Sequence, residues 1–478
     1  MAGTPAVAPA TLHVEARTTG CYGRMFPAAS APNEQYLAKL EALGRSMLAA
    51  GRNPSADCAS SFSPCGYTYF AQLVDHDVSF DRLPLAQANA FSPEGIPNRR
   101  SPWLDLDHVY GGGPGVSPQL YEGSEGAERF RLADNSDLPS GDRYKLLGDQ
   151  SLPLHERDFR DLENAMVLQL RVLFMRLHNV AIDHRLSCGL AEYDADDCTP
   201  FRKAARLVRW TYQRLVRRDL LPRVLDKTVL ARVQGDGPAF QWPDGAFFIP
   251  IEFAAAAFRF GHSIVRGSYQ MNRRSRVLLR DLISPSLATD AIPERLLIEW
   301  DNFFTTSNHR PAPMEAIDTR ITPDLGDLTA YTARITGPKE LPVRTLQRGA
   351  WMRLPSGQQV ARALGLPVLA AEQLTGAASS CDGMRDSSGE VLADAGLTEE
   401  TPLFYYILRE AELAPNCGAH LGAVGSRIVA ETLEGAFRFD ADSYWPVEGG
   451  WSPLAWPVGN GRARKIETFA DLIAVVCG

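Results

Sequence analysis

The sequence predicts a mainly α-helical protein built as one large folded unit. Several long segments carry apolar residues at helical spacing, strand-like alternation is sparse, and no internal repeat or long low-complexity linker divides the chain. Of the 478 residues, 45% are hydrophobic and 22% are charged, which is the balance of an ordinary globular protein. This composition argues against extended disorder and fibrous architectures.

The first helix is expected close to the N-terminus. Residues 1–32 are rich in Ala, Pro, Thr and Gly and are expected to run irregularly over the surface, which leaves residues 33–478 as the folded domain. Asn33 is a good N-cap for a helix over residues 34–50, and Gly51 is expected to end that helix.

Two central helices are expected on either side of a long irregular segment. Residues 67–77 predict a buried helix, and residues 159–185 predict one long helix. Only Gln169 and Arg171 interrupt the most apolar stretch of the second helix. Between the two helices, residues 81–157 are dominated by Pro, Gly, Asp and Ser, and such long segments without regular structure are usually functional.

The remaining helices are expected at 201–219, 251–266, 292–304, 402–413, 421–436 and 468–476. Thr401-Pro402 and Thr468-x-x-Asp471 are favourable starts for two of them. The first of these helices is strongly basic, but it also carries apolar residues in a chain of net charge −8. We therefore expect a surface helix paired with acidic neighbours rather than an RNA-binding helix.

Composition also bears on partners and location. The negative net charge argues against nucleic acid as a partner, and no run of 18 apolar residues is present to span a membrane. The start MAGTPAVAPATLHVEAR lacks a basic region followed by an apolar core, so a cytoplasmic location is expected. The eight cysteines form no CxxC pair, which argues against a cysteine-rich zinc site, and free thiols are expected.

The first cluster of polar residues lies in the helix at 67–77. Gln72, Asp75 and His76 are spaced i, i+3 and i+4 and share one face, whereas Asp77 points to another. A helix end with a capping Asp and a packed His is the plainer interpretation. Burial of so many polar groups among apolar neighbours nevertheless requires partners.

Two further clusters lie on later helices. Arg160, Glu163 and Asn164 share a face at the start of the second central helix, where the plainer interpretation is a first-turn Glu with a surface ion pair. His262 follows Gly261 in an otherwise apolar helix, and the glycine would let a bulky partner approach the backbone. A hydrogen-bonded core histidine is the plainer interpretation there.

A fourth cluster lies in the irregular segment. Ser101, Trp103, Asp105 and Asp107 alternate along an extended loop, so four oxygen sources can converge on a hard cation such as Ca²⁺. A merely solvated acidic loop is the alternative. The Gly-rich segment 111–115 lacks the following Lys of a phosphate loop and is expected to form a turn.

In this order, the segments resemble the animal haem peroxidase family (the peroxidase–cyclooxygenase superfamily), and its bacterial members in particular. FAQLVDHDVSFD resembles the family's distal-histidine helix, SPWLDLDHVYGGGP its calcium loop, and FRDLENAMVLQLRVLFMRLHN the helix of the distal arginine. FRFGHSIV resembles the proximal-histidine helix, and LQRGAWMRLPSGQQVARALGLP a later segment at the haem edge. The resemblance covers nearly the whole chain and implies a mainly α fold with haem b between central helices.

On the proximal side, the resemblance makes His262 the axial ligand of the haem iron through a neutral imidazole nitrogen. The family places an Asn beside the other ring nitrogen, and alignment puts Thr345 there in this chain. A hydroxyl accepts the same hydrogen bond but is a different acceptor. Arg259 and Arg348 match arginines of the haem pocket, and Arg348 is expected to meet a propionate.

On the distal side, the resemblance assigns three roles. His76 would move a proton between the two oxygens of peroxide, Arg160 would polarise the departing oxygen, and Gln72 would line the pocket. The resemblance also matches Asp75 and Glu163 to the two carboxylates that form ester bonds to haem methyl groups in the family.

Two further matches complete the implied site. Asn164 stands where myeloperoxidase has a Met, so the sulfonium link of that enzyme is expected to be absent. Asp77 would bind Ca²⁺ and fix the end of the catalytic helix. Its partners in the calcium site would be Ser101, the Trp103 carbonyl, Asp105 and Asp107.

The resemblance implies a haem peroxidase that reduces hydrogen peroxide and oxidises a small organic donor or a halide. A haem-dependent oxygenase or coupling oxidase, a haem-binding protein without activity, and a non-haem iron site on Asp75, His76 and Asp77 are the alternatives. The intact histidines and distal arginine argue against the inactive protein. Cyclooxygenases and related fatty-acid dioxygenases place a radical-forming Tyr three residues before the proximal His, and this chain has Arg259 there.

Overall fold

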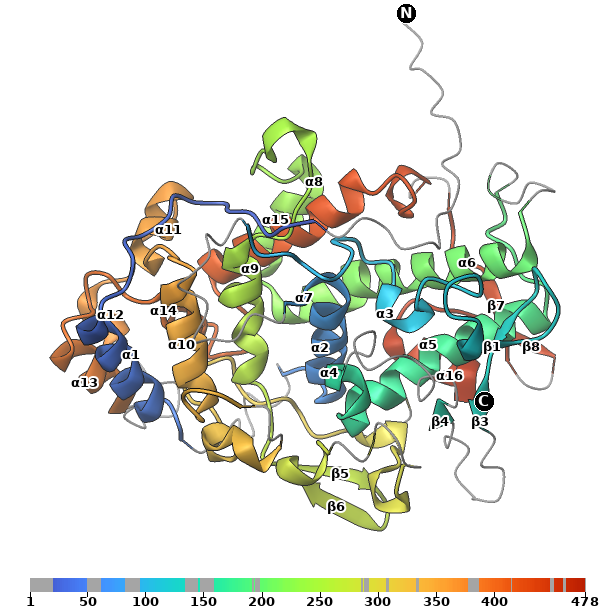
Figure 1. Cartoon of the computed structure of the whole chain (residues 1–478), viewed down its shortest axis with the longest axis horizontal. Helices are drawn as coiled ribbons and strands as arrows, with labels where there is room; N and C mark the ends of the chain where they lie inside the picture. The colour runs from blue at the N-terminus through green and yellow to red at the C-terminus, as the bar shows by residue number, and fades with distance from the viewer. Residues whose placement is uncertain are drawn as a thin grey trace, which may run out of the picture.

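The computed structural model describes residues 20–49, 62–81, 95–133, 145–146, 159–190, 193, 198–284, 287, 292–306, 309–331, 335–376, 387–413, 415–447, 451–458 and 461–477. Within these ranges the protein is mainly α-helical, as predicted (Figure 1). The α-helices are α1 (Glu34–Ser46), α2 (Gly66–Val78), α3 (Asp107–Tyr110), α4 (Phe159–Leu162), α5 (Ala165–Asp183), α6 (Pro200–Leu215), α7 (Leu221–Val224), α8 (Lys227–Asp236), α9 (Ile251–Ala255), α10 (Leu341–Trp351), α11 (Gly357–Ala363), α12 (Ala371–Leu374), α13 (Ser387–Asp394), α14 (Leu403–Glu412), α15 (Ala423–Phe439) and α16 (Phe469–Cys477).

The described strands form only short antiparallel pairs at the periphery. They are β1 (Tyr121–Glu122) with β2 (Arg129–Phe130), β3 (Leu132–Ala133) with β4 (Lys145–Leu146), β5 (Ser268–Asn272) with β6 (Ser275–Leu278), and β7 (Ala455–Val458) with β8 (Arg462–Lys465). Two non-α helical segments matter for the site or for its support, namely the π-helix η6 (Val216–Leu220) and the 3-10 helix η8 (Ala257–His262).

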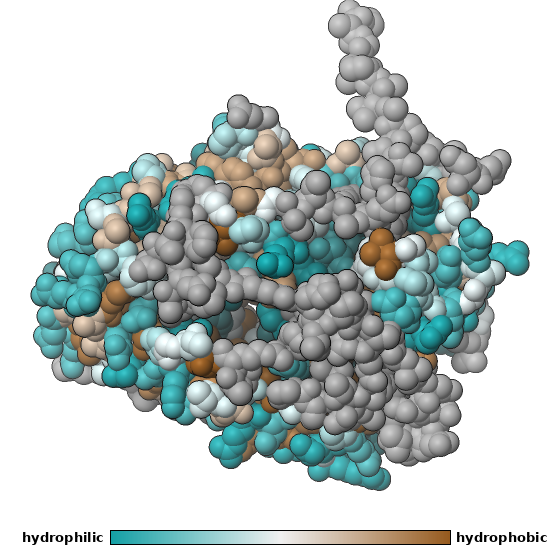
Figure 2. Space-filling model, viewed as in Figure 1, coloured by the Kyte–Doolittle hydropathy of each residue, from teal (hydrophilic) through white to brown (hydrophobic). Residues whose placement is uncertain are grey.

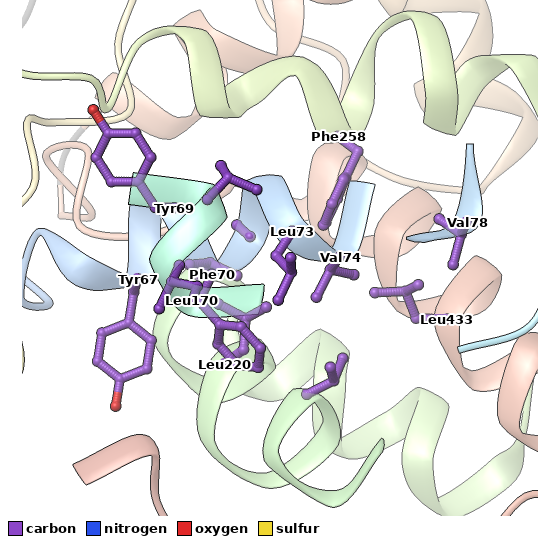
Figure 3. Close-up of a cluster of buried hydrophobic side chains, with 14 of the residues drawn as sticks. Tyr67, Tyr69, Phe70, Leu73, Val74, Val78, Leu170, Leu220, Phe258 and Leu433 are labelled. Carbon is purple, nitrogen blue, oxygen red and sulfur yellow. The ribbon is translucent and has the colours of Figure 1, made fainter. Parts of the chain in front are cut away.

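Helix α2 lies at the centre of the molecule, with α4 and α5 on one side and α9, η8 and α10 on the other (Figure 1). Its apolar residues pack against side chains from four other elements. Figure 3 shows α2 residues such as Phe70 and Leu73 among Leu170 of α5, Leu220 of η6 and Leu433 of α15. Each such fully buried apolar side chain stabilises the fold by roughly 1.5–3 kcal/mol, and this packing fixes which face of α2 carries the polar residues.

The N-terminal helix begins as predicted. The Asn33 side chain accepts a hydrogen bond from the Tyr36 N–H, and α1 starts at the next residue. It ends at Ser46 rather than at residue 50, and Gly51 lies outside the described residues.

The described part of the N-terminal segment, residues 20–32, contains no helix and no named strand. It crosses two parts of the domain. The Gly23 N–H donates to the Ile249 carbonyl at 3.3 Å, and the Ile251 N–H donates back to the Gly23 carbonyl at 2.9 Å. Arg24 Nη2 donates to the Met352 carbonyl at 2.7 Å. The segment therefore joins the start of α9 to the end of α10.

The prediction of one long helix at 159–185 is wrong, because the chain forms two helices there. Asn164 adopts an extended backbone and caps α5, accepting hydrogen bonds from the Met166 and Val167 N–H groups. The Ala165 N–H pairs instead with the Leu282 carbonyl. A short polar side chain that can satisfy free N–H groups makes this break favourable.

The helix expected at 251–266 is also interrupted. Ala256 has φ −139° and separates α9 from η8, which ends at His262. The helix expected at 292–304 is wrong, because residues 294–296 and 300–302 form only single 3-10 turns. Apolar residues alone do not distinguish such buried turns from a helix.

The C-terminal helices agree with the sequence. Helices α14, α15 and α16 lie where predicted, and the Asp471 carboxylate accepts from the Thr468 N–H at 3.0 Å to form the expected start of α16. The expectation that the basic helix lies on the surface is wrong, because most of α6 is buried against α5. Its predicted pairing with acidic residues is confirmed for Arg214 with Glu467, at 2.7 Å.

The described surface in Figure 2 is mostly hydrophilic, and hydrophobic residues appear there in separate patches. Helix α5 is long and apolar enough to cross a membrane by length and composition alone, but 83% of its 18-residue window is buried inside the protein, as in a core helix. Cys417 is disulfide-bonded, so the expectation of free thiols is wrong for that residue.

Candidate functional site

The polar face of α2 carries the predicted distal residues. Gln72 Nε2 lies 3.5 Å from His76 Nε2, which confirms that these two side chains share a face. The Asp75 carboxylate accepts a hydrogen bond from the Ser79 hydroxyl at 3.0 Å and lies 3.9 Å from Arg259 Nη1. Both His76 and Asp75 are buried in the centre of the domain.

A carboxylate that the sequence did not indicate stands behind the distal histidine. Asp161 Oδ1 lies 2.6 Å from His76 Nδ1, and both side chains are almost completely buried. Asp161 belongs to the short helix α4 and follows Arg160 directly. Its place next to the expected arginine was the only signal in the sequence, because the contact joins residues that are far apart in the chain.

The proximal histidine lies at the end of η8. His262 Nδ1 lies 3.2 Å from the Thr345 hydroxyl of α10, and that hydroxyl also bonds the Leu341 carbonyl at 2.9 Å. The Thr345 hydroxyl has a single proton, which it donates to the Leu341 carbonyl. Its oxygen can therefore only accept a hydrogen bond from the N–H at His262 Nδ1. Burial, aided by the nearby Arg259 guanidinium, lowers the pKa of His262 to about 3, so the ring is neutral and its Nε2 lone pair is available to a metal.

Two cavities lie between these histidines. The outer cavity has a volume of about 270 Å³ and the inner cavity about 240 Å³. The residues that line both are Asp75, His76, Arg259, His262 and Leu341. The distal histidine of α2 and the proximal histidine of η8 therefore both line each of the two cavities.

The two cavities differ in chemistry. The outer cavity is lined by four arginines and two aspartates, which are Arg160, Arg259, Arg344, Arg348, Asp75 and Asp81. The inner cavity is lined mostly by apolar side chains such as Leu279, Ile283 and Leu325, with Tyr69 at its wall. A planar ligand with anionic groups at one edge and an apolar body fits this division.

The predicted arginines line this space but already hold partners within the protein. Arg160 donates to the Ser79 carbonyl at 2.8 Å and to the His76 carbonyl at 3.2 Å, and it lies over the Phe80 ring at 4.3 Å. These contacts place a cation at the C-terminal end of α2, where the helix dipole favours it. Arg348 pairs with Asp81 at the mouth of the outer cavity.

The two carboxylates predicted to form ester bonds are placed differently. Asp75 lines both cavities, whereas Glu163 is not among the residues that line either one. Glu163 is buried at the junction of α4 and α5, and its neighbour Asn164 lines the inner cavity instead. The displacement follows from the helix break at Asn164, which ends the regular spacing on which the shared face of Arg160 and Glu163 depended.

The acidic loop folds over the far side of α2, as its spacing suggested. The Ser101 hydroxyl donates to Asp105 at 2.8 Å, and the Ser101 N–H donates to Asp107 at 3.1 Å. Asp77 and Asp107 lie together with His108, and ligand atoms of all three are within 4.8 Å of one another. The Trp103 ring stacks on the Phe247 ring, with 5.0 Å between their centroids.

The electrostatics of this cluster favour a cation. Burial, together with the Asp105 carboxylate, raises the pKa of Asp77 well above its ordinary value, and Asp77 Oδ2 has no hydrogen-bond partner among the described residues. Burial, with Asp105 and Asp77, also raises the pKa of Asp107 to about 7 despite the opposing Arg100. Carboxylate and hydroxyl oxygens are the donors that Ca²⁺ prefers.

His108 is a second residue that the sequence did not indicate. Its Nδ1 bonds Asp77 Oδ1 at 3.0 Å, and its Nε2 lies 3.9 Å from Asp161 Oδ2. Burial lowers the pKa of His108 to about 4. Because Asp77 faces His108 rather than the cavities, Asp75, His76 and Asp77 do not converge, and a non-haem iron site on these three residues is not formed.

The turn predicted at the Gly-rich segment is confirmed. Gly111, Gly112 and Gly113 all have positive φ, at 58°, 84° and 82°, which side-chain-bearing residues rarely adopt. The turn follows α3 directly and returns the chain after the acidic loop.

Comparison with known proteins agrees with this geometry. The model of the animal haem peroxidase family matches residues 51–381 of the chain. A curated relative, a peroxidase-like protein from Margaritifera margaritifera, is 29% identical over 241 residues, which are 44% of this chain and 25% of that protein. The matched part is thus about a quarter of the length of that relative.

Solved structures share the fold at low sequence identity. Peroxidase A from Dictyostelium discoideum aligns with a TM-score of 0.62 and 15% identity over 96% of this chain and 93% of that one. The fatty acid alpha-dioxygenase of Oryza sativa aligns with a TM-score of 0.56 and 14% identity over 94% and 79%. The enzyme of the same description from Arabidopsis thaliana has a TM-score of 0.54 and 14% identity over 94% and 76%.

Proposed function

This chain belongs to the animal haem peroxidase family, and from that premise we propose that it is a haem peroxidase that reduces hydrogen peroxide and oxidises a small organic donor or a halide. The family comprises oxidoreductases and implies haem as cofactor. The observation that carries the proposal is that His76 and His262 line the same two cavities from opposite helices, each with its Nδ1 engaged by another side chain. Nε2 of each ring is then available to the ligand between them.

The residues fit haem in three respects. The neutral His262 offers a ligand nitrogen, the apolar inner cavity suits the porphyrin body, and the arginines of the outer cavity suit its propionates. When bound, haem supplies the iron through which electrons pass from the donor to peroxide.

The protein's own side chains would handle the protons. His76 Nε2 accepts a proton from one peroxide oxygen and returns it to the other oxygen, which leaves as water. Gln72 Nε2, at 3.5 Å from that nitrogen, keeps the ring directed into the inner cavity. Arg160 lines the outer cavity together with His76 and would supply a fixed positive charge on the distal side, because a guanidinium stays protonated at any working pH.

A visible spectrum of protein expressed with sufficient haem tests the proposal. A strong Soret band is expected in the wild type, and His262→Ala should lose the haem or its stable coordination. His76→Ala should keep the haem but react slowly with peroxide. Absence of a Soret band, or wild-type reaction rates in His76→Ala, would contradict the proposed roles.

A calcium ion at the acidic loop is part of the proposal. Three carboxylates and the Ser101 hydroxyl gather at the far side of α2, and Asp77 Oδ2 is buried without a hydrogen-bond partner among the described residues. Asp77 follows His76 directly, so an ion there would fix the end of the catalytic helix. The ligands we propose are Asp77, Ser101, Asp105, Asp107 and the Trp103 carbonyl.

An oxygenase acting on fatty acids is the second candidate. The fold is shared with fatty acid alpha-dioxygenases, and Tyr69 lies at the wall of the apolar inner cavity. Against it, Arg259 lines both cavities at the position three residues before His262, and a guanidinium cannot form the required radical. An oxygen-electrode assay with linoleate separates the two candidates, because rapid peroxide-primed oxygen uptake would favour the oxygenase.

A further inference from the structure

His76 and Asp161 make a short side-chain contact on the distal face, with 2.6 Å between Nδ1 and Oδ1. Neither side chain is exposed beyond 5%. Burying a carboxylate is costly unless hydrogen bonds offset the lost hydration, so an acid at this position needs a specific donor. The imidazole N–H of His76 is such a donor.

The direction of this hydrogen bond determines the tautomer of the distal histidine. An ionised carboxylate only accepts hydrogen bonds, so Nδ1 must carry the ring proton. Nε2 then presents its lone pair. The Gln72 side-chain nitrogen, which can only donate, lies 3.5 Å from Nε2 and supports the same tautomer from the other side of the ring.

The carboxylate is itself held between two imidazoles. His108 Nε2 lies 3.9 Å from Asp161 Oδ2, and His108 Nδ1 bonds Asp77 at 3.0 Å. Packing on both sides leaves Asp161 little freedom to rotate, which is the condition for orienting a catalytic ring to within a fraction of an ångström.

We propose that Asp161 is a positioning residue that fixes the orientation and tautomer of His76, so that Nε2 faces the inner cavity as a proton acceptor. The inference rests on the proposed peroxidase function and deepens it. Asp161 acts through His76 and need not touch peroxide or haem. Its role corresponds to that of carboxylates that orient histidines in other active sites.

Association of cyanide with the ferric protein and its reaction with hydrogen peroxide measure the consequence, because both ligands must give up a proton to a distal base. Asp161→Ala should slow both reactions by roughly 10- to 100-fold. Asp161→Asn keeps the size of the side chain and can still accept through its amide oxygen, so it should retain more activity. The Soret band should be kept in both variants.

Asp219→Asn is the matched control. Asp219 is another buried carboxylate, which accepts from the Tyr67 hydroxyl at 2.7 Å and from Arg223 Nε at 2.8 Å. Its replacement removes comparable hydrogen bonds without touching His76. Rates in Asp161→Ala within twofold of those in Asp219→Asn would overturn the proposal.

Proton NMR of the full chain, reduced under carbon monoxide so that bound haem is diamagnetic, reads the hydrogen bond directly. A resonance downfield of the amide region is expected in the wild type and in Asp219→Asn, and it should be absent from Asp161→Ala and His76→Ala. In Asp161→Asn the resonance should move upfield, because a neutral amide oxygen is a weaker acceptor than a carboxylate. Its persistence in Asp161→Ala would refute the proposal. A wild type that shows the resonance but does not react with peroxide would refute the proposed function and leave the positioning role intact.

Discussion

Replacement of Thr345 by valine should raise the reduction potential of the haem iron. The Thr345 hydroxyl donates its proton to the Leu341 carbonyl, so toward His262 Nδ1 at 3.2 Å it can only accept. Valine keeps the shape and removes the acceptor, which leaves the imidazole a poorer electron donor to ferric iron. A neutral hydrogen bond contributes ~1 kcal/mol, and 1.4 kcal/mol corresponds to about 59 mV for one electron, so the rise should be on the order of 40 mV.

Thr432→Val provides the comparison for this measurement. The fully buried Thr432 hydroxyl donates to the Ile428 carbonyl, four residues earlier, at 2.8 Å. This variant therefore loses the same kind of hydrogen bond that Thr345→Val loses to Leu341, but no contact with His262. Spectroelectrochemical titration of the ferric–ferrous couple measures both. Thr345→Asn should lower the potential below that of the wild type, because an amide oxygen is a stronger acceptor. Equal potentials in Thr345→Val and Thr432→Val would refute the reasoning.

Three further outcomes are expected. After turnover with peroxide, extraction with acidified solvent should leave haem on the wild type and on Glu163→Gln but remove it from Asp75→Asn. The reason is that, of the two carboxylates, only Asp75 lines the two cavities. Complete extraction of haem from the wild type would exclude an ester bond. Prolonged chelation should lower the melting temperature and the haem content of the wild type but have little further effect on Asp77→Asn, and metal analysis that finds no Ca²⁺ in active protein would rule the site out. Burial lowers the pKa of His178 to about 4, whereas a histidine in the unfolded chain has a pKa of ~6.5. Between these two values the unfolded chain binds a proton that the native protein does not bind, so the free energy of unfolding falls as the pH falls from about 6.5 towards 4. In urea denaturation the difference in unfolding free energy between wild type and His178→Gln should therefore shift by about 2 kcal/mol against the wild type between pH 7 and pH 5, and a constant difference would contradict this assignment.

Features set by local spacing could be predicted well from the sequence. Gln72 and His76 share a face because one turn of helix separates them, and no distant contact is needed for that result. The same rule placed Asp77 on another face, where it meets the acidic loop. Thr345 required the family resemblance in addition, because nothing local connects it to a histidine 83 positions earlier.

Features set by tertiary contacts could not be predicted in this way. Asp161 is one residue among many acidic ones, and only the packing of α4 against α2 brings it to His76. The helix break at Asn164 requires the Asn164 side chain to accept from the N–H groups of the next turn. It also requires the Leu282 carbonyl, which is distant in the sequence, to accept from the Ala165 N–H. The position of Glu163 away from the cavities follows from that same break.

The path of residues 20–32 sets a practical limit on how far the chain can be shortened from its N-terminal side. Sequence patterns alone would suggest trimming the chain just before α1, at residue 33. The crossing segment, however, ties the start of α9, which leads to His262, to the end of α10, which carries Thr345, and Tyr22 within it forms part of the outer cavity wall. A clone that begins at residue 33 would lose these hydrogen bonds while keeping His262, Thr345 and the proposed distal residues in the sequence. Purification tags and shortened versions of this protein should therefore keep the chain from residue 20 onward.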